Sequence, residues 1–210
     1  LTARDGAATM GNGDEFGVFN DQSRGPDKDR DPNKEESITV AVVENRAREI
    51  CLAVMNRVDG FIVEVYIVAD SHTFIETITT LRGIGPDEIL LPDNARGSTL
   101  SKKIKYEFAS LDDGGGEEKS NNKARLIFMS RRYFDQDLGA ELLKSVIVDH
   151  VDADLVAKYT VLASCYCLLR YIENITGSNF AAHSMRLSFK SGTADRMFID
   201  RRTAAGKFEF

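Results

Sequence analysis

The sequence has few of the residues that build metal centres and disulfide frameworks. Its 210 residues include three cysteines and three histidines, and none of them has the spacing of a metal-binding motif. Cys165 and Cys167 are two residues apart, so on a helix they point to different sides. We therefore expect Cys51, Cys165 and Cys167 to be buried thiols in a reducing compartment, not a disulfide framework.

Long apolar runs are also missing. No segment is long enough to cross a bilayer, and residues 1–10 lack the basic stretch and apolar core of a secretory signal. With 42% apolar and 29% charged residues, the composition is that of a globular protein. The formal charge of −6 gives no overall attraction to nucleic acid, so any such contact must come from a local patch or from a missing part.

Two common catalytic motifs are absent. The chain has no Gly-x-Ser-x-Gly elbow, which positions the nucleophile of many serine hydrolases. The glycine-containing stretches at residues 83–85 and 114–116 lack the Lys-Ser/Thr of a phosphate loop. The sequence therefore gives no reason to assign a catalytic serine or a nucleotide site.

The longest segment with helical spacing is residues 155–174. Its apolar side chains recur at intervals of three and four, which gathers them on one side of a helix: Leu155, Tyr159, Leu162, Tyr166 and Leu169. No Gly or Pro interrupts the segment, and Asp152 or Asp154 can cap its start. We predict one continuous helix, around which the rest of the chain is arranged.

Apolar, β-branched runs before this helix predict strands at residues 38–43, 50–56, 61–69, 88–91 and 124–129. Helical spacing predicts helices at residues 73–81, with Ser71 as its N-cap, 99–111 and 137–148. The order is three strands, helix, strand, helix, strand, helix. A three-stranded meander followed by two parallel crossovers gives a ribonuclease-H-like α/β fold with a mixed sheet.

Other segments predict no regular structure or only short stretches of it. Residues 1–37 are polar and charged, and we expect a disordered tail. Residues 112–122 read as a flexible surface insertion. Residues 185–189 and 196–199 are short apolar stretches after the long helix. Because the chain starts at Leu and stops in mid-pattern, we expect a piece of a longer protein.

The ribonuclease-H-like order requires a test for catalytic carboxylates, since active nucleases of this class hold two metal ions on their first strand, first helix and fourth strand. The candidates are Glu44, Glu76 and Asp93. The centre of the first strand carries no acid, Glu76 fits a solvent-facing helix position, and Asp93 follows a proline in a turn. We therefore predict no catalytic, metal or cofactor-binding residue in this span.

Two basic pairs are candidates for phosphate contacts. Arg131-Arg132 follow a predicted strand, and Arg201-Arg202 follow Asp200. Neither pair belongs to a longer basic stripe, so a solvated surface pair is the favoured interpretation.

Several segments resemble, in order, the connector domain of the MutS family. They are ITVAVVENRAREICLAV, HTFIETITTL, DEILLPDNA and RRYFDQDLGAELL. The long helix with its CLLRYIE end resembles the first helix of the MutS core (lever) domain. Residues 185–210 resemble the segment after it, where the family's Met-x-Ile/Leu-Asp-x-x-Thr pattern is matched by Met197, Ile199, Asp200 and Thr203, followed by Phe208-Glu209-Phe210.

The resemblance implies a division into a polar tail (1–37), a connector domain (38–151) and the start of a lever domain (152–210). It favours the meiotic members of the family over the mismatch-repair members, which carry a Phe-x-Glu wedge in a domain before the connector. Phe74-Ile75-Glu76 matches those letters, but on a predicted helix of the connector, where we interpret it as chance.

The family implies a nuclear DNA clamp that acts in meiotic recombination as a heterodimer with a second MutS homologue. Its full-length members use ATP and Mg²⁺, and nothing implies a membrane. This span would then be a non-catalytic piece that couples the ATPase end to the DNA-binding end. The alternatives are a mismatch-repair MutS protein and a metal-dependent ribonuclease-H-like nuclease.

Overall fold

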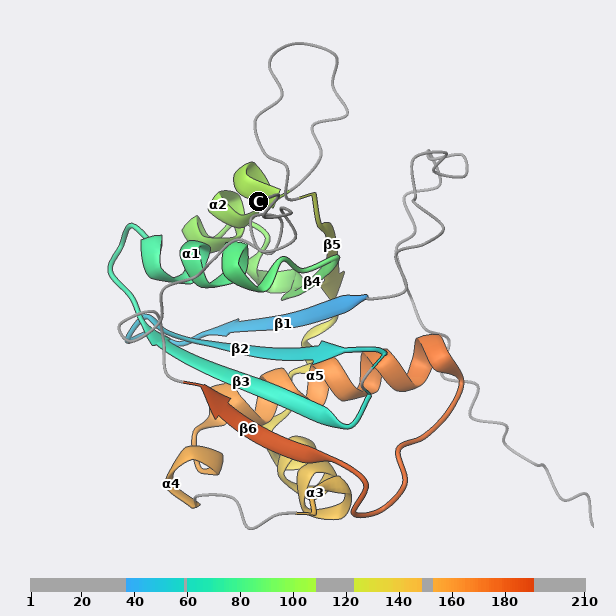
Figure 1. Ribbon diagram of the computed structural model, residues 1–210. Coiled ribbons are helices and arrows are strands. Elements are labelled where there is room, and N and C mark those ends of the chain that lie inside the picture. Colours follow the sequence, from blue (N-terminus) through green and yellow to red (C-terminus); the bar gives the residue numbers. More distant parts are fainter. Residues whose placement is uncertain (1–36, 59, 109–122, 149–152, 191–210) are drawn as a thin grey trace, which may run out of the picture. The chain divides into compact units, whose positions relative to one another are not determined.

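The structure, a computed structural model, describes residues 37–58, 60–108, 123–148 and 153–190. The strands are β1 (Ile38–Glu44), β2 (Glu49–Asn56), β3 (Ile62–Ala69), β4 (Glu88–Pro92), β5 (Arg125–Met129) and β6 (Arg186–Lys190). The α-helices are α1 (Ile75–Ile84), α2 (Thr99–Phe108), α3 (Gln136–Val146), α4 (Ala153–Val156) and α5 (Tyr159–Thr176). Two 3-10 turns, η1 (Asp93–Ala95) and η2 (Arg131–Tyr133), follow β4 and β5 (Figure 1).

One mixed sheet joins all six strands in the order β5-β4-β1-β2-β3-β6. The pairs β1/β2 and β2/β3 are antiparallel, whereas β1/β4, β4/β5 and β3/β6 are parallel. The predicted α/β class, the meander and the two parallel additions are therefore confirmed. The sixth strand was not predicted: the apolar stretch at 185–189 extends the sheet beside β3.

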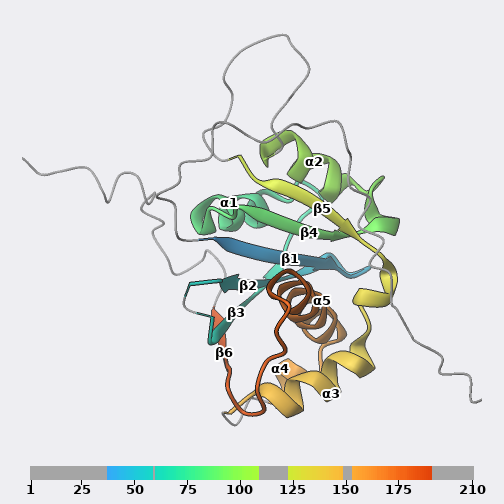
Figure 2. The same ribbon diagram turned by 90° about the vertical axis from the view of Figure 1, so that its right-hand side faces the viewer.

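Helices cover both faces of the sheet (Figures 1 and 2). On one face, α1 and α2 pack over alternate residues of β1 such as Val40 and Val42. On the other face, α5 contacts β1 and β2, and the small cross-strand pair Ala41 and Ala53 is fully buried there. Coverage on both sides explains why β1 and β2 read as continuous apolar runs instead of alternating patterns.

The predicted start of the first helix is wrong. α1 begins at Ile75, and its N-cap, Phe74, is left-handed and has no side-chain cap. Ser71 instead accepts the Thr73 backbone N–H at 3.3 Å. The first turn of α1 is held by Asp70, which accepts both the backbone N–H and the hydroxyl of Thr77, since a carboxylate has more acceptor sites than a serine hydroxyl.

The predicted single helix over residues 155–174 is divided near its start. The break lies at Lys158, whose backbone is extended (φ −74, ψ 120). Its ammonium group pairs with Glu49 of β2 at 2.7 Å. An extended residue ends the run of helical hydrogen bonds, so the preceding turn becomes α4 and the longer part becomes α5.

The predicted boundary at residue 151 remains a prediction, although the described residues after it do not stand apart from the sheet. α5 lies on β1 and β2, α3 packs on α5, and β6 pairs with β3. Residues 1–36, the insertion at 112–122, and the stretch 191–210 with Arg201-Arg202 lie outside the described residues.

Candidate functional site

The three candidate nuclease carboxylates lie toward the same end of the strands but do not form a metal site. Glu44 ends β1, Asp93 follows the parallel strand β4, and Glu76 is in the first turn of α1. Asp93 is exposed and bonded to Arg96, and Glu76 is exposed. Within the described part of the chain, no three His, Cys, Asp or Glu side chains come close enough to hold a metal ion.

Glu44 is half-buried. Burial raises its pKa, and the Arg48 guanidinium offsets part of this rise. A carboxyl group of this kind could take part in proton transfer, but the described residues give it no converging partner carboxylates. The prediction that the span holds no catalytic residue therefore stays a prediction, with Glu44 as the residue to test.

The candidate phosphate contacts are ordinary surface features where they are described. Arg131 and Arg132 are exposed in η2, and the Arg132 guanidinium lies 5.0 Å from the centre of the Tyr133 ring. Gly83 is inside α1 and Gly85 is its left-handed C-cap. The Gly-Ile-Gly stretch is thus used to end a helix and leaves no loop to surround a phosphate.

The described residues include a buried ionic cluster around Glu88, the first residue of β4. The Glu88 side chain is only 10% exposed. One of its oxygens, Oε2, accepts the Thr39 hydroxyl at 3.3 Å and the Tyr171 hydroxyl at 3.1 Å. Arg57 lies 3.7 Å from the same oxygen, and Arg125 lies 3.6 Å from Oε1. Residues of β1, β5 and α5, together with Arg57 just after β2, therefore meet at a single carboxylate.

The chemistry of this cluster favours a structural role. Two cations and two hydroxyl donors engage the two oxygens of Glu88, so both oxygens are taken up by contacts within the protein. Burial, and then the neighbouring carboxylate, raise the pKa of Tyr171, so its hydroxyl keeps its proton and remains a donor. The cluster can therefore tie the C-terminal half of α5 to the start of β4.

A second group of buried polar atoms lies between α5 and β2. The Cys51 thiol is 3.1 Å from the Ser164 hydroxyl, which itself donates to the Val161 carbonyl at 3.0 Å. Because that hydroxyl has one proton, the thiol is the donor of the first bond. Burial raises the pKa of Cys51 to about 12, and it also raises the pKa values of Cys165 and Cys167.

These thiols are protonated at neutral pH, so they are poor nucleophiles and poor metal ligands. The prediction of three buried, unpaired cysteines is confirmed. Sequence reasoning did not identify the Glu88 cluster or the Cys51–Ser164 contact. The acid at the start of an apolar strand, Glu88, was the available signal, since a charged residue there needs partners if it is buried.

None of the helices in the described ranges is long and apolar enough to cross a membrane. No known protein-family model matches the chain. The mixed sheet and the helices that pack on it define an α/β unit. Its sequence is similar to proteins of the MutS family, and that similarity confirms the resemblance found in the sequence motifs.

The relatives are homologues number four of that family. MutS protein homolog 4 of Homo sapiens is 28% identical over 174 residues, which cover 80% of this chain and 17% of the relative. MutS protein homolog 4 of Mus musculus is 25% identical over 80% of this chain and 17% of its own length. DNA mismatch repair protein MSH4 of Arabidopsis thaliana is 24% identical over 81% of this chain and 21% of its own length. The chain thus spans about a fifth of these relatives.

Proposed function

We propose that this chain is a non-catalytic part of a MutS-homologue DNA clamp subunit that acts in meiotic recombination, in crossover formation. Its sheet and helices would be the ribonuclease-H-like connector, which couples the ATPase end of the protein to its DNA-binding end. Support comes from the similarity to homologues number four and from the strand order, with a meander followed by two parallel strands.

The observation that carries the proposal is the attachment of α5 to the sheet. Tyr171 bonds to Glu88 near one end of the helix, Ser164 meets Cys51 in the middle, and Lys158 pairs with Glu49 at the start. A helix held at three points along its length cannot shift without the sheet. Such a unit transmits displacement as one body, which a coupling module requires.

The rest of the proposal concerns the whole protein. By resemblance, the full-length protein would bind ATP and Mg²⁺ outside this span, pair with a second MutS homologue, encircle DNA and work in the nucleus. The division into connector (38–151) and lever (152–210) is part of the same hypothesis, and the packing of α5 and β6 on the sheet favours a later boundary.

A full-length experiment tests the coupling. We expect that replacing Ser164 with Ala and Tyr171 with Phe together lowers ATP-dependent conversion to a DNA-encircling clamp while basal ATP hydrolysis changes less than twofold. The readout is retention on end-blocked against open-ended DNA. A matched control is the exposed pair Tyr106→Phe and Ser145→Ala. Unchanged clamp formation in a variant with loosened α5, shown by faster hydrogen exchange, would contradict the proposal.

The nuclease alternative has a direct test, because the topology brings Glu44, Glu76 and Asp93 to the same end of the strands. The chain would be incubated with Mg²⁺ or Mn²⁺ and a labelled duplex or RNA–DNA hybrid. We expect no cleavage. Cleavage that disappears in the Glu44→Gln variant, but not in the Glu141→Gln variant on α3, would contradict our proposal and support the metal-dependent nuclease.

The mismatch-repair alternative is separated by substrate. One relative is named a DNA mismatch repair protein, so full-length protein should be compared on a mispaired duplex and on a four-way junction. We expect preference for the junction. A stronger preference for the mispaired duplex would favour the mismatch-repair members instead.

A further inference from the structure

The junction between α4 and α5 is a break in a segment whose sequence favours one helix. Residues 153–176 contain no Gly or Pro, and their apolar side chains keep helical spacing from Leu155 to Leu169. The structure nevertheless turns α4 away from the axis of α5 (Figure 1). The break falls at Lys158, whose φ of −74 suits a helix and whose ψ of 120 does not. A rotation of about 160° about its Cα–C bond would bring Lys158 to helical values.

The break leaves main-chain donors unused at the start of α5. The carbonyl of Lys158 accepts the first main-chain bonds of this helix, at 3.0 and 3.2 Å. The N–H groups of the next two residues, Tyr159 and Thr160, have no main-chain acceptor among the described residues. In a continuous helix, each would donate to the carbonyl four residues earlier, in α4. The acceptors that these donors need are therefore present in the adjoining turn of the chain.

The buried hydroxyl of Thr160 indicates the same alternative. Thr160 is 1% exposed, and its Oγ1 has no hydrogen-bond partner among the described residues. Thr80 in α1 and Thr176 in α5 each donate to the carbonyl four residues earlier, both at 2.8 Å. In a continuous helix, the Val156 carbonyl would take this position for Thr160. Because a buried hydroxyl without a partner costs free energy, the break carries a penalty that the continuous helix would remove.

The contact that opposes a continuous helix is the ion pair between Lys158 and Glu49 of β2, whose charged atoms are 2.7 Å apart. Rotation about the Cα–C bond of Lys158 carries its Cβ with it and takes the ammonium group away from Glu49. The two side chains are 37% and 25% exposed, and a pair this exposed changes an equilibrium only about two- to fivefold. α4 adds little packing, since Val156 is half-buried and Ala157 is exposed. A weak restraint thus opposes the unused donors.

We propose that the α4–α5 junction is a two-state hinge, in which residues 153–176 also form one continuous helix and the Lys158–Glu49 pair favours the broken form. The broken form is the major one. A partner that places a cation on Glu49 in exchange for Lys158 would select the continuous form, which makes the hinge a regulatory device within the fold. The proposal does not depend on the connector function, because it rests on contacts of α4, α5 and β2 alone.

The test uses the whole 210-residue chain and nuclear magnetic resonance. Relaxation dispersion detects minor forms that exchange in microseconds to milliseconds. We expect dispersion at Lys158, Tyr159 and Thr160, with a minor-form Cα shift of Lys158 in the helical range. Glu49→Gln should raise the ratio of continuous to broken form about two- to fivefold. If exchange is faster, the Cα signal of Lys158 itself should move toward the helical value in this variant.

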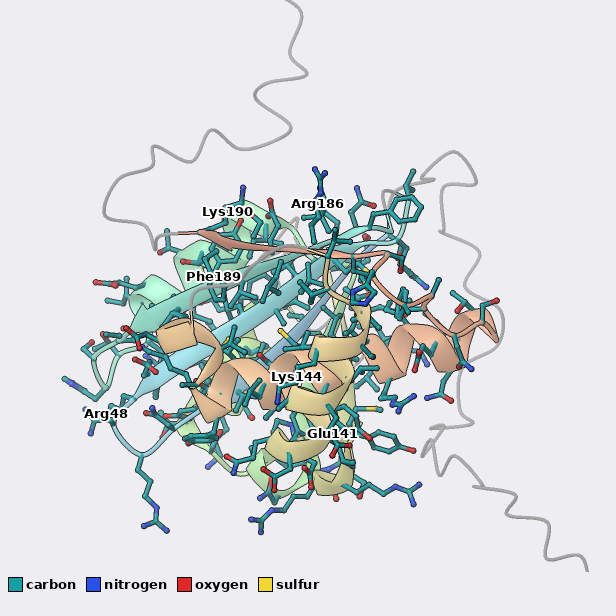
Figure 3. All side chains as sticks on the ribbon, turned by 90° about the horizontal axis from the view of Figure 1, so that it is seen from below. Arg48, Glu141, Lys144, Arg186, Phe189 and Lys190 are labelled. Atoms are coloured by element: carbon teal, nitrogen blue, oxygen red, sulfur yellow. The ribbon has the colours of Figure 1, made fainter. Side chains whose placement is uncertain are left out.

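A matched change of charge is Glu141→Gln, which removes an exposed acid on the outer side of α3 (Figure 3) and should leave the ratio unchanged. Lys158→Gln removes the ion pair from its other side and should act as Glu49→Gln does. The proposal is wrong if the wild type and both pair variants show neither dispersion nor a moved Cα signal at residue 158.

A proline separates the hinge from ordinary fraying of a helix end. Proline fits the first position of a helix, which Tyr159 occupies, and it disfavours helical backbone in the residue before it. Tyr159→Pro should therefore keep the broken form and abolish the dispersion at Lys158, whereas Tyr159→Ala should retain it. Thr160→Val should lower the share of the continuous form, because only that form bonds the hydroxyl. Dispersion that survives in Tyr159→Pro, or is lost equally in Tyr159→Ala, would refute the hinge.

Discussion

The two faces of the sheet are held by different means. Beneath α1 and α2 lies a large apolar cluster that includes Leu81, Ile104 and Phe108. Beneath α5, apolar packing is combined with polar contacts, such as those of Tyr171 and Ser164. Apolar contacts are non-directional, whereas hydrogen bonds fix orientation. The first face therefore supplies stability, and the second adds a defined position for its helix.

Removing the helix from the α5 face should have the largest effect on folding. We expect a chain ended at residue 151, the predicted connector boundary, to lose cooperative unfolding, because the buried face of β1 and β2 would be exposed to water. Circular dichroism during heating and dye binding measure this, with a chain ended at residue 190 as the control. A cooperatively folded shorter chain would instead support the boundary at 151.

A smaller effect is expected where α3 approaches α5. A Cβ atom added at Gly139 would lie 2.5 Å from the Leu162 carbonyl oxygen, and a backbone atom cannot rotate away. We expect Gly139→Ala to lower the free energy of unfolding by about 2–3 kcal/mol, measured by urea denaturation. Gly97→Ala, where no atom lies within 4 Å of the added Cβ, should be nearly neutral. Equal values for the two variants would mean that the helices separate freely.

The polar link to the sheet should contribute less than this close contact. Tyr171→Phe removes one donor to Glu88 while Thr39, Arg57 and Arg125 remain. We expect a loss of about 1–2 kcal/mol in the same urea measurement. Hydrogen exchange should speed up in the C-terminal half of α5 more than in α1. Tyr106→Phe is the control, since Tyr106 is 69% exposed. A comparable loss of stability in that variant would show that the Tyr171–Glu88 bond does not stabilise the protein specifically.

The smallest effect is expected at the partly exposed pair of Lys158 and Glu49. Lys158→Met should cost about 0.2–1 kcal/mol, and the difference from wild type should shrink in high salt because salt screens exposed charges. Lys144→Met on α3 is the matched change at an exposed cation. A salt-independent loss would indicate packing instead of charge.

The α1/α2 face was predictable because its helices pack against strands that are their neighbours in the sequence. Each crossover helix lies between strands that are close in sequence, and apolar periodicity identifies both. The α5 face depends on distant pairings: Cys51 and Ser164 are 113 residues apart. The apolar stripe of the helix was visible in the sequence, but no local signal says which surface it covers.

The same limit applies to the polar features. Glu88 is a single acid in an apolar strand, and its partners come from β1, β5, α5 and the turn after β2. The extended residue Lys158 pairs with Glu49, which is far away in sequence. β6 is short and depends on β3 for its pairing. Composition and periodicity identify elements, whereas these features depend on which elements meet.

The late position of α5 in the chain has a consequence for synthesis. A ribosome makes β1 and β2 more than a hundred residues before it makes Thr176, the last residue of α5. Throughout that interval one surface of the central hairpin has no cover, while the α1 and α2 side can already close. The nascent protein therefore passes through a half-covered stage that is open to chaperones and to aggregation.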